Sequence, residues 1–124
     1  MFKSVKYHVS AGLIGYVEVK IWVQDDKIHY SKSSLKIGDE NVKDAISPVS
    51  VETFSKKIES IRIPSWGKNY EPVGYIVLDG ESWDVKYEDS DNCISKSSGS
   101  DAYPANWKRF LSILSEVAGN VGID

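Results

Sequence analysis

Acidic side chains are concentrated between positions 79 and 91, and Lys86 is the only basic residue among them. The carboxylates are those of Asp79, Glu81, Asp84, Glu88, Asp89 and Asp91. Such groups can serve as general acids and bases, bind cations or attract a basic protein. The sequence does not say which two carboxylates face each other, so no catalytic pair can be assigned. The segment is interpreted either as a solvated hairpin or as a docking surface for a basic partner.

The two histidines and the single cysteine do not form a known catalytic or metal-binding pattern. His8 and His29 both lie in segments of alternating polarity, so we expect each to point outward from a strand. Zinc sites use three or four ligands at characteristic spacings. Cys93 has acidic neighbours, whereas a reactive thiol needs a cation or a helix N-terminus nearby. We interpret Cys93 as a small strand residue and expect no catalytic residue, no metal and no cofactor.

Two short patterns are similar to calcium and phosphate sites but lack essential residues. Asp89, Asp91 and Asn92 are spaced like the first ligands of a calcium loop. The loop glycine is missing, and Ser100 stands where the bidentate glutamate is needed. The glycine pair near the N-terminus lacks the Gly-Lys-Ser/Thr ending of a phosphate loop. The first pattern therefore predicts a hairpin turn, and the second a loop.

Strict alternation between residues 16 and 23 predicts a strand with two different faces. One face carries Val17, Val19, Ile21 and Val23, and the other carries Tyr16, Glu18, Lys20 and Trp22. If the aliphatic face is buried, Tyr16 and Trp22 are exposed, and exposed aromatic residues are typical anchors of protein interfaces. The alternative is a sheet that is covered on both faces by one helix each. Under the first interpretation, Tyr16 and Trp22 are candidates for partner binding.

The first half of the chain predicts three strands followed by a helix. Alternating residues indicate strands at 5–9, 16–23 and 28–33, and the polar segment 34–47 is expected to be a loop. The next segment predicts a helix that has Ser50 as its N-cap. The apolar face of this helix consists of Val51, Phe54, Ile58 and Ile61.

The second half predicts three more strands and a terminal helix. Strands are expected at 75–78, 82–88 and 93–96, followed by a loop at 97–101. Asp79-Gly80 predicts a two-residue hairpin turn between the first two of these strands. The last helix has an apolar stripe of Trp107, Phe110, Leu111, Leu114 and Val117, and Gly119 is its expected C-cap. The predicted fold is α+β, an antiparallel sheet of about six strands with two helices in the order βββα-βββα, forming a single domain over residues 1–124.

The second half also carries a recognisable aromatic pattern. It consists of Trp66, Asn69-Tyr70, then 78–83 (LDGESW), then 99–107 (GSDAYPANW), and Phe110. This resembles a group of small, uncharacterised bacterial proteins that end in a DGxxW…GxxAYPxxW…F pattern. The resemblance implies a shared fold and carries no activity or catalytic residue, and Asp101 replaces the group's usual asparagine. Because large rings anchor a small core efficiently, we interpret the pattern as structural rather than as a ligand pocket.

The bulk composition excludes several classes of function. The chain has 124 residues and a net charge of −3, and a mildly acidic protein gives phosphate backbones little to bind, so we expect no nucleic-acid partner. One cysteine cannot form an internal disulfide, which agrees with a reducing compartment. The apolar segment 9–17 is short and broken by glycine, so we expect no signal peptide and no membrane association. These features together predict a cytoplasmic protein.

The sequence therefore predicts a non-enzymatic module that binds another protein. The sharper hypothesis is a bacterial immunity or antitoxin protein that blocks a basic toxin domain such as a nuclease. The alternative is a small-molecule-binding or enzymatic domain whose pocket lies between the sheet and the C-terminal helix. A deep cleft lined by Asp79, Asp84 or Tyr103 would favour that alternative. A third possibility is the subunit of a homo-oligomer.

Overall fold

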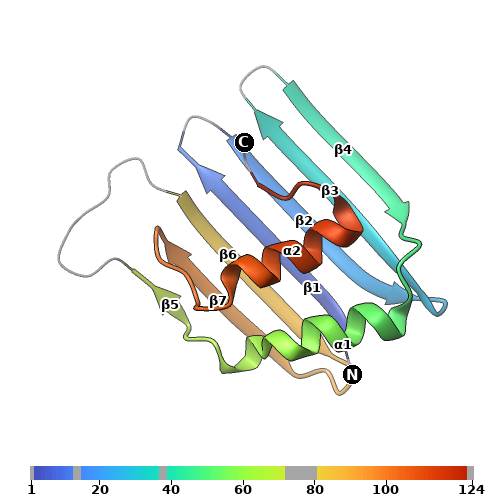
Figure 1. The fold of residues 1–124 in the computed structure, drawn as a ribbon. Coiled ribbons are helices and arrows are strands. Elements are labelled where there is room, and N and C mark those ends of the chain that lie inside the picture. Colours follow the sequence, from blue (N-terminus) through green and yellow to red (C-terminus); the bar gives the residue numbers. More distant parts are fainter. Residues whose placement is uncertain (1, 13–14, 37–38, 72–80, 123–124) are drawn as a thin grey trace.

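The computed structural model describes residues 2–12, 15–36, 39–71 and 81–122. Within these ranges the chain forms a seven-stranded sheet in the order β4-β3-β2-β1-β6-β7-β5 (Figure 1). The strands are β1 (Phe2–Ala11), β2 (Gly15–Gln24), β3 (Lys27–Lys36), β4 (Asp39–Ile46), β5 (Asn69–Tyr70), β6 (Glu81–Asp89) and β7 (Ile94–Ser100). The helices are α1 (Val51–Ile61) and α2 (Trp107–Ala118), and a short 3-10 helix, η1 (Ile63–Ser65), follows α1. The described strand pairs are antiparallel, except that β5 runs parallel to β7. The predicted α+β class is confirmed.

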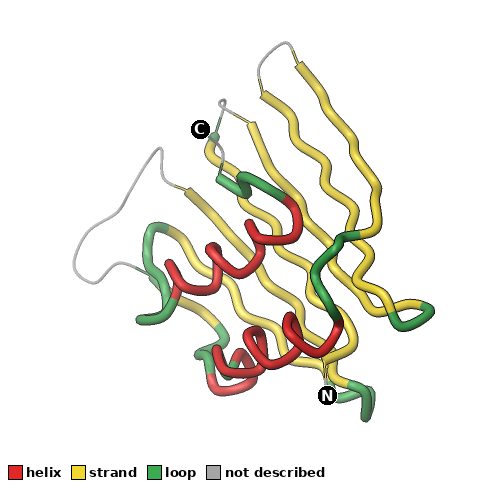
Figure 2. Tube along the Cα trace, turned by 45° about the vertical axis from the view of Figure 1, so that its right-hand side comes forward, coloured by secondary structure: helices red, strands yellow, loops and turns green. Residues whose placement is uncertain are grey.

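Both helices cover the same face of the sheet. Figures 1 and 2 show α1 and α2 side by side in front of the strands, and none of the described elements lies behind the sheet. Both helices contact the sheet through β3, and α1 also contacts β1. The alternative expectation of one helix on each face is therefore wrong. We refer to the uncovered side of the sheet as the open face.

The core fills the space between the sheet and the two helices. Its fully buried aliphatic side chains come from alternate positions of the central strands and from the apolar helix stripes, as the sequence periodicity predicts. They include Val5, Val9, Val19 and Ile21 from the sheet and Ile58, Ile61 and Leu114 from the helices. Each such side chain stabilises the fold by about 1.5–3 kcal/mol relative to exposure.

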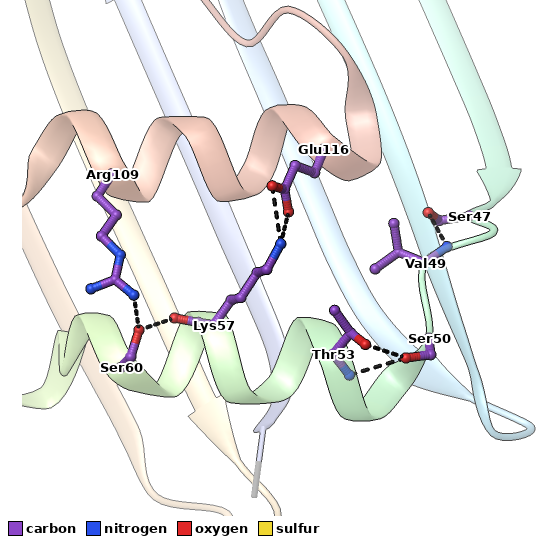
Figure 3. Close-up of polar contacts among 8 residues, drawn as sticks. All are labelled: Ser47, Val49, Ser50, Thr53, Lys57, Ser60, Arg109 and Glu116. Carbon is purple, nitrogen blue, oxygen red and sulfur yellow. Dashed lines mark hydrogen bonds and ion pairs between the residues drawn. The ribbon is translucent and has the colours of Figure 1, made fainter.

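Polar contacts fix the start of α1 and hold the two helices together (Figure 3). The Ser50 hydroxyl accepts a hydrogen bond of 3.1 Å from the Thr53 backbone N–H, which confirms the predicted N-cap. Lys57 of α1 forms an ion pair of 2.9 Å with Glu116 of α2 (Figure 3). Because both charged groups are half-exposed, this ion pair contributes at most about 1 kcal/mol. The helix pair is therefore aligned mainly by its buried face.

The aromatic pattern of the second half forms one cluster beneath α2. The ring centroids of Trp83 and Trp107 lie 4.4 Å apart, and Trp66 packs against both rings. The indole N–H of Trp83 donates a hydrogen bond of 2.9 Å to the Ala102 carbonyl. A Cβ atom on Gly99 would lie 2.6 Å from the Trp83 indole nitrogen, so no larger residue fits there without a shift. Glycine is thus required at this position by close packing.

The remaining polar residues of the pattern bind the ends of neighbouring elements. Asn106 donates to the Ile61 carbonyl at the end of α1 and accepts from the Trp66 indole. Asp101 has a left-handed backbone, with φ 47°, and its carboxylate accepts a hydrogen bond of 2.9 Å from the Glu81 N–H. Aspartate and asparagine tolerate this conformation better than most residues. These contacts support the structural interpretation of the pattern.

The structure differs from the sequence prediction in four places. Segment 34–47, expected to be a loop, contains β4, and segment 97–101, also expected to be a loop, lies mostly within β7. Cys93 is exposed in the turn before β7 rather than lying in a strand. The short parallel strand β5 was not predicted. The expected strand 75–78 and the Asp79-Gly80 turn lie outside the described residues.

The reason for the β4 error lies in its position at the edge of the sheet. Its sequence, DENVKDAI, alternates poorly because an edge strand has only one neighbour, and the side chains from Val42 to Ile46 are exposed or half-buried. Val42 and Ile46 point to the open face and are 65% and 53% exposed, while Ala45 points to the core side and is half-buried. Charged residues in an edge strand are a common protection against aggregation. They also disrupt the apolar–polar alternation from which a strand is predicted.

Candidate functional site

The open face carries four lysines in one straight row across four neighbouring strands. Lys20 of β2 lies directly opposite Lys6 of β1, Lys6 lies opposite Lys86 of β6, and Lys86 lies opposite Lys96 of β7. We call these four residues the lysine row. Since neighbouring strands lie about 4.8 Å apart, the row spans about 14 Å. Strand register alone creates it, because the four residues are scattered along the sequence.

The positive charge of the lysine row is only partly compensated. Lys6 forms an ion pair of 3.1 Å with Glu18 in the next row. The Lys20 ammonium lies 5.6 Å from the centre of the Trp22 ring, a cation–π distance. Lys86 and Lys96 form no ion pair with any of the residues that the structure describes. Like charges directly opposite each other in a sheet are destabilising, so this row lowers the stability of the fold.

A shallow hollow lies on the open face over β1, β6 and β7. Its volume is about 680 Å³, and it is bordered by Lys6, Lys86 and Lys96 of the lysine row and by Lys68. Within the part of the chain that the structure describes, Asp84 is the one carboxylate that lines it. The hydroxyl of Ser98 and the side chain of Ile94, which is 52% exposed, complete its rim. The hollow can therefore receive an anionic group that also has some apolar surface.

The predicted aromatic residues Tyr16 and Trp22 lie on this same face. Tyr16 stacks on His8 with ring centroids 5.6 Å apart, and Trp22 stacks on His29 at 5.8 Å. All four rings are half-buried. The two histidines point outward, as the sequence predicts. His8 also lies 3.6 Å from the Asp84 carboxylate.

Exposed apolar side chains continue the open face towards β4. Leu35 is 37% exposed and lies directly opposite Tyr16, while Ile46 lies opposite His29. Val42 lies between them along β4, but the polar residues Ser31 and Ser33 separate Ile46 from Leu35, so the apolar side chains are interspersed with polar ones. Aromatic and aliphatic side chains mixed with charged groups are the composition of many protein-binding surfaces.

The acidic residues predicted to form one docking surface are divided by the sheet. Asp84 and Glu88 are on the open face, where Glu88 forms an ion pair of 2.9 Å with Lys3. Glu81 is on the helix side and accepts a hydrogen bond of 3.0 Å from the Tyr103 hydroxyl. Burial and this hydrogen bond raise the pKa of Tyr103 above its usual value. The structure thus does not gather these carboxylates into one patch.

The last members of the acidic segment belong to a turn. The Asp89 carboxylate accepts hydrogen bonds from the backbone N–H groups of Asp91 and Cys93, at 2.9 and 3.1 Å. Asn92 has a φ of 62° and completes the reversal of the chain. Asp91 is exposed within this turn, and Asp79 lies outside the described residues. The similarity to a calcium loop is therefore explained by a side-chain-stabilised turn.

A pocket between the sheet and α2, the basis of the alternative function, is not supported by these positions. Tyr103 packs on the rings of Trp83 and Trp107 on the helix side, with centroid distances of 6.3 and 5.3 Å. Asp84 is on the opposite side of the sheet, so the two cannot line one cleft. The aromatic cluster occupies the space beneath the N-terminal half of α2.

Two further properties concern metals and membranes. Within residues 2–12, 15–36, 39–71 and 81–122, no three His, Cys, Asp or Glu side chains are grouped closely enough to hold a metal ion. Neither described helix has the length and apolar character that crossing a bilayer requires.

No family model, curated protein or solved structure matches the chain. The function is therefore argued from the open face itself. Sequence reasoning found Tyr16 and Trp22 but missed the lysine row. The outward position of each lysine could have been predicted from strand alternation, but their alignment depends on the pairing of strands that are distant in sequence.

Proposed function

We propose that the protein is a non-enzymatic module that binds another protein through the open face of its sheet. The observation that carries this proposal is that both helices lie on one side, which leaves Trp22, Val42 and Ile46 uncovered on the other. Exposed aromatic and aliphatic residues with a charged border are what a protein interface requires. The face is built on paired strands, so little ordering is needed when a partner binds.

Within this class we propose an immunity or antitoxin protein that covers the active site of a toxin. A rigid, uncovered sheet is suited to blocking a site by steric occlusion alone, without chemistry of its own. The division of the acidic segment between two faces weakens the case for a basic partner. A toxin whose active site is built from carboxylates, as in metal-dependent nucleases, fits the lysine row better.

The proposal is tested by comparing variants of the open face with a variant of the helix side. Purified protein is used to capture a partner from its native host, and the captured protein is identified by mass spectrometry and prepared separately. Binding is then measured for wild type, Val42→Asp and Ala105→Asp by calorimetry. Both substituted positions are exposed, and Ala105 precedes α2 on the opposite side of the sheet.

We expect Val42→Asp to weaken binding at least tenfold and Ala105→Asp to leave it unchanged. Tenfold corresponds to about 1.4 kcal/mol, a modest loss for a central interface residue. Equal binding by the two variants would place the interface elsewhere. For the immunity hypothesis, co-expression with the partner should protect cells from the partner's toxicity, and a partner that is harmless when expressed alone contradicts it.

A further inference from the structure

We infer, building on the proposed function, that the lysine row receives the acidic face of a helix belonging to the partner protein. Lys86 and Lys96 lack ion pairs among the described residues, and Lys68 borders the same hollow without one. Three lysines without an ion pair thus border a hollow in which, among the described residues, Asp84 is the single lining carboxylate. A partner that supplies carboxylates at these positions would balance the charge.

The geometry of the lysine row favours a helix over an extended segment. The lysines recur at the distance between neighbouring strands, about 4.8 Å. Acidic residues at positions i, i+4, i+7 and i+11 of a helix recur about every 5.4 Å along one face. Side chains on one face of a strand recur only about every 6.7 Å, so an extended segment loses alignment with the lysines after one step. A helix that crosses the strands along the row can engage all four.

The composition of the open face favours a protein over a single-stranded nucleic acid. Base recognition on a sheet needs aromatic rings whose faces are free for stacking. One face of Tyr16 and one face of Trp22 are already covered by the stacked rings of His8 and His29. The carboxylates of Glu18, Asp84 and Glu88 also border the lysine row and would repel a phosphate backbone. A protein surface can present charges of both signs to match this pattern.

The apolar neighbours of the row provide a place for the rest of the helix. Ile94 lies at the β7 end, and Trp22 contacts Lys20 at the β2 end. An amphipathic helix that carries acidic residues beside apolar ones would place carboxylates on the lysines and apolar side chains on these residues. Charge would then guide the approach, and apolar contact would slow dissociation.

The test uses two helical peptides of about 20 residues, a length at which an isolated helix can form. One carries glutamates at i, i+4, i+7 and i+11, and the other has the same composition with the glutamates distributed around the helix. A single-stranded oligouridylate is the third probe. Binding is followed through backbone amide shifts in NMR spectra, for wild type, Lys86→Glu/Lys96→Glu and Lys27→Glu/Lys43→Glu. The last variant has the same charge change away from the row, since Lys43 faces the helix side opposite Lys32.

We expect the peptide with its glutamates on one face to change the NMR shifts of backbone amides around Lys6, Lys20, Lys86 and Lys96. The isomeric peptide and the Lys86→Glu/Lys96→Glu variant should each show binding at least tenfold weaker, and Lys27→Glu/Lys43→Glu should bind normally. Equal binding of the two peptides, absence of binding by both, or stronger binding of the oligouridylate would overturn the inference. If the captured partner responds to Val42→Asp but not to Lys86→Glu/Lys96→Glu, the proposed function stands and the inference about the lysine row fails.

Discussion

Lys86 lies directly opposite Lys6 in the antiparallel pair of β1 and β6, and it lies opposite Lys96 in the pair of β6 and β7. It is therefore flanked on both sides by a like charge. Cross-strand pairs contribute on the order of 0.2–1 kcal/mol each, and like charges act in the unfavourable direction. The sheet tolerates this arrangement at its centre, as we expect if the surface serves the proposed binding function rather than stability.

Removing the charge of Lys86 should stabilise the protein. We expect Lys86→Gln to raise the free energy of unfolding by about 0.5–1 kcal/mol, because both repulsive pairs are relieved and a polar side chain only slightly shorter than lysine is kept. Lys27→Gln is the control, since Lys27 is an exposed strand residue that lies opposite Gln24. Urea denaturation of the three proteins measures the effect. A gain that is equal in both variants would reflect net charge rather than the lysine row.

Gly99 should not tolerate a methyl group. A Cβ atom there would lie 2.6 Å from the Trp83 indole nitrogen and 2.7 Å from the Ala102 carbonyl oxygen. We expect Gly99→Ala to destabilise the fold by about 1–3 kcal/mol through overpacking, as measured by the urea midpoint. Gly67→Ala is the matched control, because the nearest atom to its Cβ would be at an ordinary 3.5 Å. If both variants unfold at the same urea concentration, the close approach of Gly99 to Trp83 does not restrict which residue position 99 can hold.

The N-cap of α1 should be replaceable by another acceptor but not by a methyl group. Ser50→Ala removes the acceptor for the Thr53 N–H, so we expect a loss of about 1 kcal/mol in thermal or chemical denaturation. Ser50→Asp keeps an acceptor and adds negative charge at the positive end of the helix dipole. It should retain at least the stability of wild type. An equal loss in the two variants would show that the serine acts by some route other than capping.

Alkaline pH should destabilise the fold partly through Tyr87. Burial, together with the nearby carboxylates of Glu59 and Asp89, raises the pKa of Tyr87 to about 12. In the unfolded chain a tyrosine ionises near pH 10, so between about pH 10 and 12 the folded state holds the proton more tightly. The unfolded state then binds fewer protons, and stability falls as the pH rises through this window.

Replacing the titrating group identifies its share of this effect. We expect Tyr87→Phe to weaken the fall in unfolding free energy between pH 9.5 and 11.5, values that bracket the ordinary tyrosine pKa of about 10. The control is Tyr16→Phe on the open face, where the ring is half-buried. Denaturation curves at several pH values provide the measurement. Parallel curves for Tyr87→Phe and wild type would contradict the assignment.

Local features of the sequence determined which side of a strand or helix is buried. The alternation around Val19 and Ile21 correctly predicted the inward side of β2, and the spacing of Phe54, Ile58 and Ile61 correctly predicted the buried stripe of α1. These predictions succeed because side-chain direction follows from a backbone period of 2.0 or 3.6 residues, which is readable in a single segment. The Ser50 cap is equally local.

The candidate site depended on relations that no single segment contains. Alternation places Lys6, Lys20, Lys86 and Lys96 on the outside of their strands, but only the register of three strand pairs aligns them. Conversely, Glu81 is separated from Asp84 and Glu88, which are close to it in sequence, because neighbouring residues of a strand point to opposite faces. The sequence could not show that both helices pack on one side, since that is decided by long-range burial rather than by local propensity. It is this packing that leaves the lysine row uncovered.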